Sequence, residues 1–179
     1  MGHDTGLEIE RKYLLAGAPA ASDLAALGAR DVRIEQAYLR AEDEWVRRVR
    51  RTDRGGTIRH VFTRKRDVAG IVREEFETDL TAVEYERLLA DADPARRVIR
   101  KTRHVFTSGR WTLELDVFSD PVGLVLLEVE LDDAADEPEL PPVIASLVVR
   151  EVSTEAAYTN HVLALRPPVE PTTPPVEPA

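Results

Sequence analysis

The sequence predicts a mainly β fold with peripheral helices (α+β), in which eight antiparallel strands close into a barrel. Three observations support this prediction. Short runs in which apolar and charged side chains alternate recur through most of the 179 residues, as in half-buried strands. Turn-forming residues separate these runs, and few segments show helical periodicity. Eight antiparallel strands suffice to close a barrel that holds side chains or one small ligand.

The predicted strands are separated by residues that favour turns. A hairpin signal, Asp53-Arg54-Gly55-Gly56, lies between the third and fourth strands. Ser108-Gly109 separates the sixth strand from the seventh, and Pro121 to Gly123 interrupts the chain before the eighth. The expected strands are 6–15, 32–41, 44–52, 57–66, 71–79, 98–107, 111–117 and 124–131.

Four short helices are expected around these strands. Ser22 is a candidate cap for the first, and Thr81 with Glu84 has the spacing of a capping box at the start of the second. The expected helices cover 23–28, 81–90, 143–147 and 154–165.

Composition and charge restrict the class of protein. One domain over 1–165 is the simplest division, and the Pro-rich stretch 166–179 has too little apolar content to fold, so it should be a disordered tail. A net charge of −9 disfavours non-specific nucleic-acid binding. The chain has no cysteine, which excludes disulfides and thiolate metal sites. With no signal peptide or membrane-length apolar run, we expect a cytoplasmic monomer or homodimer with no membrane partner.

Charged side chains recur at i and i+2 in most of the predicted strands. Because successive side chains of a strand point to opposite faces, each such pair shares a face. The pairs are mostly of one sign within a strand. They are Glu8, Glu10 and Lys12; Arg48 and Arg50; Thr63 and Lys65; Arg73, Glu75 and Glu77; Lys101 and Arg103; Glu114 and Asp116; and Glu128 and Glu130.

The opposite faces of the later strands are apolar, as in Leu113 with Leu115 and Leu127 with Val129. An ordinary sheet with one wet face also places polar residues at every second position. Such a face usually mixes polar types, however, whereas here like charges are paired. We therefore expect helices to cover an apolar outer surface and the charges to face a solvated lumen.

A lumen with charges of both signs suits a cation and an anion bound together. Clustered carboxylates need a counter-charge to stay ionised, and Mg²⁺ or Mn²⁺ supplies it through oxygen ligands. Clustered Lys and Arg side chains need an anion, and a polyphosphate supplies one. The pattern therefore predicts a site for a nucleotide or polyphosphate together with a divalent metal.

These motifs, in their order along the chain, resemble the CYTH superfamily, the triphosphate tunnel metalloenzymes. Glu8, Glu10 and Lys12 resemble its E-x-E-x-K signature. The resemblance spans about 7–165, nearly everything except the tail. The other similar segments are Glu35 to Leu39, Arg48-Val49-Arg50, Thr63-Arg64-Lys65, Glu75-Phe76-Glu77, Lys101-Thr102-Arg103, Glu114-Leu115-Asp116, Glu128-Val129-Glu130 and Tyr158-Thr159-Asn160.

The resemblance implies an eight-stranded tunnel that binds a triphosphate at its centre together with one or two Mg²⁺ or Mn²⁺ ions. Basic side chains would grip the phosphate oxygens, and acidic side chains would bind the metal. The implied phosphate-binding residues are Lys12, Arg48, Arg50, Lys65, Lys101 and Arg103. The implied metal ligands are Glu8, Glu10, Glu128 and Glu130, supported by Glu75, Glu77, Glu114 and Asp116.

Three residues are implied to be catalytic: Lys65, Tyr38 and Lys12. Lys65 with Tyr38 resembles a proton-handling pair of bacterial tripolyphosphatases. For Tyr38, packing inside the barrel is an equally good explanation.

The chain departs from many relatives at one position, just before Tyr158. They carry a basic residue there that reaches the phosphates, and this chain has Ala157. Either Arg150 or His161 compensates, or the tunnel holds one end of its ligand less tightly. The departure bears on the choice of substrate more than on the fold.

The expected function is metal-dependent hydrolysis of a triphosphate-containing small molecule, inorganic tripolyphosphate before nucleoside triphosphates. A class IV-type adenylate cyclase and a thiamine triphosphatase are alternatives, because both need the same site. The sequence shows no obvious element for recognising a base, which favours the hydrolase over the cyclase. A non-enzymatic polyphosphate- or nucleotide-binding module is a further alternative, which the intact acidic pairs disfavour.

Overall fold

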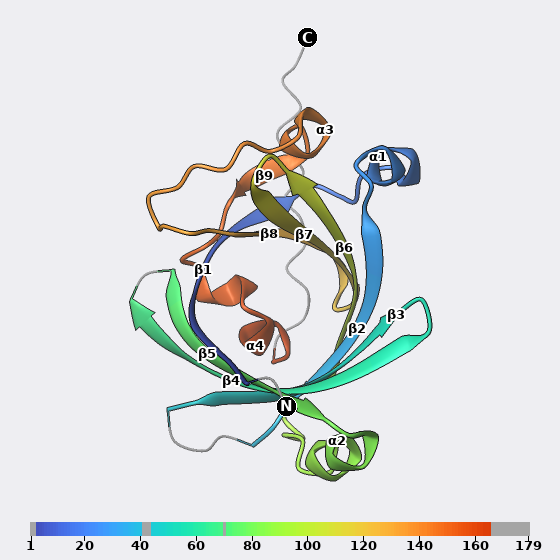
Figure 1. Ribbon diagram of the computed structural model, residues 1–179, viewed down its shortest axis with the longest axis vertical. Helices are drawn as coiled ribbons and strands as arrows, with labels where there is room; N and C mark the ends of the chain where they lie inside the picture. Colours follow the sequence, from blue (N-terminus) through green and yellow to red (C-terminus); the bar gives the residue numbers. More distant parts are fainter. Residues whose placement is uncertain (1–2, 41–43, 70, 166–179) are drawn as a thin grey trace.

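The computed structural model describes residues 3–40, 44–69 and 71–165. Within these residues nine strands form one antiparallel sheet, and eight of them close into a barrel that Figure 1 shows along its lumen. The strands are β1 (His3–Leu15), β2 (Arg30–Tyr38), β3 (Val46–Arg54), β4 (Thr57–Ala69), β5 (Val72–Leu80), β6 (Ile99–Ser108), β7 (Trp111–Asp120), β8 (Val122–Glu130) and β9 (Val148–Glu151).

β1 closes the barrel because it pairs with a different strand on each of its edges. Residues 10–14 pair with β8 on one edge, and residues 3–9 pair with β5 on the other. The order around the ring is β1, β5, β4, β3, β2, β6, β7 and β8. The predicted closed barrel of eight antiparallel strands is therefore confirmed.

Two strand predictions need correction. β9, which pairs with the C-terminal end of β1, was not expected, because its four residues are too short to show an alternating pattern. β7 and β8 also run further than expected toward Pro121, where the predicted break is a tight hairpin turn with Ser119 opposite Val122. The hairpin signal after β3 is confirmed, since Gly55 and Gly56 both have positive φ.

The described helices are α1 (Ala21–Ala26), α2 (Ala82–Leu89), α3 (Pro142–Ala145), α4 (Asn160–Leu163) and the 3₁₀ turn η1 (Ala156–Tyr158). α2 has the predicted capping box, with both hydrogen bonds between Thr81 and Glu84 present. Ser22 lies inside α1 and does not cap it. Among the helices of the described residues, none is long and apolar enough to cross a membrane.

The single helix expected over 154–165 is instead η1 followed by α4. Thr159 separates them, because its backbone is extended (φ −75°, ψ 139°) and its side chain accepts a hydrogen bond from the Val162 amide. The predicted tail over 166–179 lies outside the described residues.

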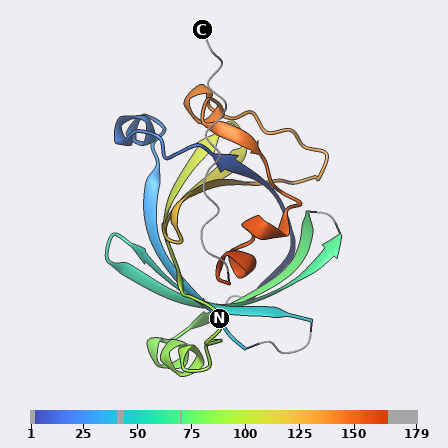
Figure 2. The same cartoon turned by 180° about the vertical axis from the view of Figure 1, so that it is seen from behind.

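The outside of the barrel is apolar in two places, and helices cover both, as the alternation predicts. α1 and α3 lie against one side, and α2 lies against the other (Figures 1 and 2). Under α2, Tyr85 packs with Ala37, Leu39 and Val49. The larger cluster, on the side of α1 and α3, contains Leu15, Phe106, Trp111, Leu113, Leu115, Val125, Leu127, Val129, Leu131 and Ile144.

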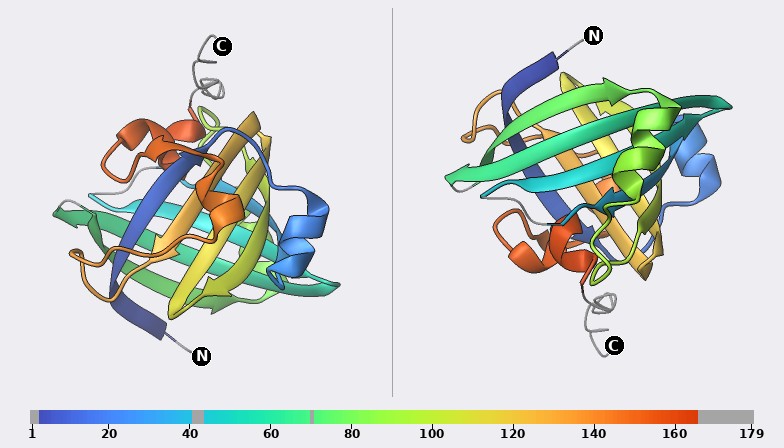
Figure 3. Two further views of the ribbon diagram at one scale, coloured as in Figure 1. Left: turned by 90° about the horizontal axis from the view of Figure 1, so that it is seen from above. Right: turned by 90° about the horizontal axis from the view of Figure 1, so that it is seen from below.

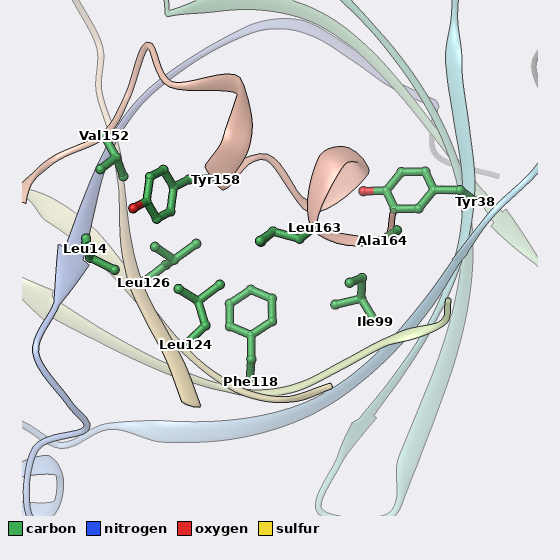
Figure 4. Close-up of a cluster of buried hydrophobic side chains, with 10 residues drawn as sticks. All are labelled: Leu14, Tyr38, Ile99, Phe118, Leu124, Leu126, Val152, Tyr158, Leu163 and Ala164. Carbon is green, nitrogen blue, oxygen red and sulfur yellow. The ribbon is translucent and has the colours of Figure 1, made fainter. Parts of the chain in front are cut away.

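η1 and α4 lie inside one end of the lumen, beside the inner faces of the strands (Figures 1 and 3). We call these residues, 156–163, the plug. The barrel residues beneath them form an apolar floor, which Figure 4 shows together with the buried plug residues Tyr158 and Leu163. The floor consists of Leu14, Tyr38, Ile99, Phe118, Leu124, Leu126 and Val152.

The plug should contribute substantially to stability through Leu163, whose side chain is fully buried on the floor. We expect Leu163→Ala to lower the free energy of unfolding by about 3 kcal/mol, because it removes buried methyl groups and leaves a cavity. Chemical denaturation followed by circular dichroism measures this change.

Leu165→Ala is the matched control, because Leu165 is 48% exposed two residues further along. It should change the free energy of unfolding by less than about 0.5 kcal/mol. Equal effects of the two substitutions would mean that the plug does not dock on the floor.

Candidate functional site

The rest of the lumen is a chamber of about 590 Å³, lined by all eight barrel strands and, at one end, by the plug. Its described charged lining residues come from the rows that the i, i+2 spacing places on one face. They are Glu10, Lys12, Arg48, Arg50, Lys65, Asp67, Arg73, Glu75, Glu77, Lys101, Arg103, Glu114, Glu128 and Glu130. The charged rows therefore face the lumen.

The inward-facing rows change from apolar to charged on four neighbouring strands. On each strand the last apolar residue of the floor is followed, two positions away, by a charged residue. The pairs are Leu14 and Lys12 on β1, Leu126 and Glu128 on β8, Phe118 and Asp116 on β7, and Ile99 and Lys101 on β6. The chamber thus has a charged wall directly above an apolar floor.

The first group of ion pairs surrounds Arg103, on the side of the wall formed by β1, β6, β7 and β8. Its guanidinium bonds Asp116 through two nitrogens at 2.8 and 2.7 Å and Glu128 at 2.6 Å, and it also pairs with Glu114. Lys12 lies 2.9 Å from the other carboxylate oxygen of Glu128, and Lys101 pairs with Asp116. We call this group the Arg103 network.

The second group lies across β3, β4 and β5. Arg50 donates to Glu77 at 2.8 Å, and Thr63 donates to the same carboxylate oxygen at 3.0 Å. Arg48 lies 3.6 Å from Glu75, which also pairs with Lys65. Three predicted phosphate-binding residues and two predicted metal ligands are thus in mutual contact.

A third group lies where β1 meets β5 and β8. Glu10 is opposite Glu130 in the β1–β8 register and pairs with Arg73 at 2.5 Å and Lys12 at 3.5 Å. Glu8 lies opposite Arg73 in the β1–β5 register. The side chain of Glu8 lies outside the described residues.

Burial and neighbouring charges shift several pKa values within the Arg103 network. Burial opposes ionisation of Glu128, but Lys12, Arg103 and Lys101 hold the pKa of its carboxyl well below the usual range. Burial would lower the pKa of Lys12, but Glu128 and Glu10 outweigh burial and raise it. Burial lowers the pKa of Lys101 to about 8, although Asp116 opposes this shift.

The second group shows similar effects. Burial, aided by the positive charge of Arg48, lowers the pKa of Arg50 to about 10. Burial opposes ionisation of Glu77, but Arg50 and Arg48 lower the pKa of its carboxyl. These carboxylates therefore remain ionised at neutral pH and can act as acceptors or ligands.

The donor chemistry of the chamber fits a divalent metal. Within the described residues, no three carboxylates or histidines converge on one point, because each acid turns toward a basic neighbour. Carboxylate oxygens, the ligands that Mg²⁺ and Mn²⁺ prefer, are nevertheless present on adjacent strands of the chamber wall. Glu10 facing Glu130 across β1 and β8 is a like-charge pair, which a bound cation would stabilise.

The predicted catalytic residues all line the chamber, but they do not form one cluster. Lys12 belongs to the Arg103 network. Tyr38 lies at the plug end, where its oxygen accepts a hydrogen bond from Gln36 at 3.1 Å and burial raises its pKa. Lys65 lies on β4, and β3 runs between it and Tyr38.

Asp116 differs from the other predicted metal ligands. Its side chain has no exposed surface, because it lies between Lys101 and Arg103. It is not part of the chamber lining. We infer that it acts by positioning these two basic side chains.

The structure also shows where Ala157 lies, at the position where the resemblance led us to expect a basic residue. Ala157 is partly buried and packs against the apolar floor. Arg150 does not line the chamber, since it bonds Glu155 and the hydroxyl of Tyr158. His161, the second residue expected to compensate for Ala157, does line the chamber.

Some lining residues were not assigned a role from the sequence, namely Arg73, Gln36 and Asn160. The spacing could have identified Arg73, because it lies two positions before Glu75 in the same row. Gln36 lies two positions before Tyr38, but the i, i+2 pattern of charged residues could not identify it because it is uncharged. Asn160 reaches the chamber only because the plug folds into the lumen.

Comparison with solved structures supports this fold. The crystal structure of the inorganic triphosphatase NE1496 is 30% identical in sequence, with a TM-score of 0.59, and the match covers 90% of this chain and 100% of that one. The PH1819 protein from Pyrococcus horikoshii OT3 is 19% identical, with a TM-score of 0.54, over 73% of this chain and 81% of that one.

A putative adenylate cyclase from Bacillus halodurans is 15% identical, with a TM-score of 0.51, over 80% of this chain and 97% of that one. At such identities the likeness shows the fold alone. Among curated proteins, none matches the chain.

The sequence motifs, the closed barrel and the charged chamber agree with the family match. The CYTH domain matches residues 6–157. This range includes all eight barrel strands except the first three residues of β1, and it ends within the plug. This chain belongs to the CYTH domain family.

Proposed function

We propose that the protein hydrolyses a triphosphate inside the chamber with the help of a divalent metal, and that inorganic tripolyphosphate is its first substrate. The observation that carries the proposal is the ring of paired charges that seven of the eight barrel strands place in the chamber, with β2 contributing Gln36 and Tyr38. The 30% identity to a protein described as an inorganic triphosphatase, over that protein's full chain, supports it.

The charge balance of the chamber explains why a metal would be needed. Of the described charged lining residues, seven are basic (Lys12, Arg48, Arg50, Lys65, Arg73, Lys101 and Arg103), and seven are acidic. The wall is therefore close to neutral overall, whereas a triphosphate carries several negative charges. Divalent cations entering with the triphosphate would restore the balance.

The ion pairs would exchange partners when substrate and metal bind. Basic side chains now paired with carboxylates would turn to phosphoryl oxygens, which suit the fork of Arg48, Arg50 and Arg103. The released carboxylates of Glu8, Glu10, Glu128 and Glu130 would hold the metal, with Glu75, Glu77 and Glu114 in support. A bound divalent ion would neutralise phosphoryl charge and lower the pKa of an attacking water.

The chain's own residues would also handle the proton. In the overall reaction, water adds to the terminal phosphorus, the bridging P–O bond breaks, and diphosphate leaves with the electron pair. Lys101 is suited to accept a proton, because burial lowers its pKa to about 8. Lys65 with Tyr38 is the alternative pair.

The first test incubates the protein with Mg²⁺ or Mn²⁺ and, in parallel, tripolyphosphate, ATP or thiamine triphosphate. We expect release of phosphate from tripolyphosphate at the highest kcat/KM, abolished by a chelator. Cyclic AMP formed from ATP would favour the adenylate cyclase instead. Binding without turnover of any of the three would favour a polyphosphate-binding module.

Glu128→Gln should lower kcat for tripolyphosphate on the order of a hundredfold, because it removes a carboxylate that contacts both Lys12 and Arg103. Steady-state kinetics at saturating metal measures the loss, and circular dichroism checks that the barrel still forms. Glu74→Gln is the matched control on the outer face of β5, where Glu74 pairs with Arg66. A Glu128→Gln enzyme with kcat near that of the control would contradict the assignment.

The pH dependence should identify the lysine that moves the proton. If Lys101 is the base, kcat/KM rises as the pH increases through about 8, because the ammonium group must lose its proton first. Lys101→Arg should lower kcat and remove this rise, because a guanidinium stays protonated.

Lys65→Arg provides the comparison at the alternative lysine and should keep the rise in kcat/KM. Loss of the rise in Lys65→Arg and not in Lys101→Arg would assign the proton transfer to Lys65. Measuring kcat/KM between pH 6 and 10 for the three proteins distinguishes these cases.

A further inference from the structure

The plug contributes polar residues to the chamber lining that the proposed hydrolysis does not use. Thr159, Asn160 and His161 all line the cavity. The hydroxyl of Thr159 is engaged within the plug, donating to the Ala156 carbonyl at 2.8 Å. In contrast, the buried Oδ1 of Asn160 and Nδ1 of His161 have no hydrogen-bond partner among the described residues. Buried polar atoms of this kind usually have a partner, which here can come from a bound ligand or water.

Arg96 determines which nitrogen of His161 carries the proton. A guanidinium nitrogen of Arg96 lies 2.8 Å from Nε2 of His161, and another donates to the backbone carbonyl of the same residue. Because a guanidinium can only donate, Nε2 must accept. The ring proton therefore lies on Nδ1, the atom without a partner. Asp93 accepts from Arg96 at 3.2 Å and holds the guanidinium in place.

The surroundings of His161 also keep its ring neutral. Burial lowers its pKa, and the positive charge of Arg96 lowers it further, against a smaller opposing effect of Asp93. The other titratable group against the ring is Tyr38, whose ring meets it edge to face with centroids 5.1 Å apart. At neutral pH the plug thus offers an uncharged N–H donor.

The two atoms without a partner are the Oδ1 of Asn160, which accepts a hydrogen bond, and the Nδ1–H of His161, which donates one. An ionised phosphoryl oxygen would satisfy the Nδ1–H of His161, but it would face the Asn160 oxygen, which repels it. A hydroxyl oxygen can donate to Asn160 and accept from His161 at the same time. The chemistry of the pair therefore fits a hydroxyl group better than a phosphoryl group.

We propose that Asn160 and His161 form a hydroxyl-binding subsite at the plugged end of the chamber, with Arg96 as the residue that positions the imidazole. This inference rests on the proposed function, since it assigns the end of the same chamber. The hydroxyl belongs either to the water that attacks the triphosphate or to the sugar of a nucleoside triphosphate. Lys12, the charged position next to the apolar floor on β1, would hold the adjoining phosphate.

The tautomer can be tested without any enzymatic activity. In protein labelled with ¹⁵N-histidine, the signal of His161 is assigned by its absence from His161→Phe. We expect a neutral ring with the proton on Nδ1 at pH 7 and a change of tautomer population in Arg96→Gln. A protonated ring, or a proton on Nε2 in the wild type, would overturn the proposal.

Kinetics of His161→Phe distinguish the two sources of the hydroxyl. If the subsite holds the attacking water, kcat for tripolyphosphate falls about tenfold, the value of one neutral hydrogen bond, with KM unchanged. His161→Asn, which returns an N–H near the position of Nδ1, should restore much of that loss. If the subsite holds the sugar, tripolyphosphate kinetics are unchanged and KM for ATP rises to that of its dideoxyribose analogue.

His104→Phe is the matched control, because His104 pairs with Asp31 outside the chamber. Asn160→Leu should reproduce the effect of His161→Phe, and thermal unfolding of each variant checks folding. If the wild type hydrolyses nothing, the proposed function fails, and calorimetric binding of ATP and its dideoxyribose analogue then tests the subsite. Unchanged kinetic and binding constants in both plug variants would overturn the proposal.

Discussion

The structure depends above all on the mutual compensation of charges inside a closed barrel. Removing isolated carboxylates or guanidinium groups from water is costly, and a buried charge persists only with partners of opposite sign. Here Glu128 lies between Lys12 and Arg103, and Asp116 lies between Arg103 and Lys101. Each of these ion pairs joins two different strands. Arg103 on β6 reaches past β7 to Glu128 on β8. The network therefore exists only when β1, β6, β7 and β8 are in register.

The same compensation makes the chamber suitable for an ionic ligand. The ion pairs hold basic and acidic side chains in place before any ligand arrives, which reduces the cost of ordering them on binding. A ligand that brings both an anion and a cation can replace each pair without leaving a buried charge unpaired. A triphosphate with a divalent metal is such a ligand, whereas a phosphate anion alone would leave the carboxylates facing it.

The apolar floor and the plug give the barrel two different ends. The change from Leu14 to Lys12 on β1, repeated on the neighbouring strands, separates a packed region from a solvated one within a single lumen. Ala157 packs on that floor, and the polar plug residues that line the chamber are Thr159, Asn160 and His161. Members of one fold family can differ in function through such local residues. Under the proposed function, the substrate choice of this chain would depend on its plug as well as on the barrel.

The sequence by itself determined the barrel and its polarity. The i, i+2 spacing of residues such as Glu75 and Glu77, or Arg48 and Arg50, required them to share a face, because that period is a property of any extended chain. The apolar rows between them required cover, which α1, α2 and α3 supply. Capping residues such as Thr81 likewise act locally and could be read directly.

Only the tertiary structure decided which charges meet and what the C-terminal segment does. The pairing of Arg103 with Glu128 depends on strand register, and the lowered pKa of Lys101 depends on burial; neither has a local signal. β9 was missed, and the plug was predicted as one continuous helix over 154–165 when it is a 3₁₀ turn followed by a short α-helix. Short segments follow their packing partners more than their own propensity. Asn160 and His161 line the chamber for the same reason: residues 156–163 fold back onto strands as distant in the chain as β1 and β2.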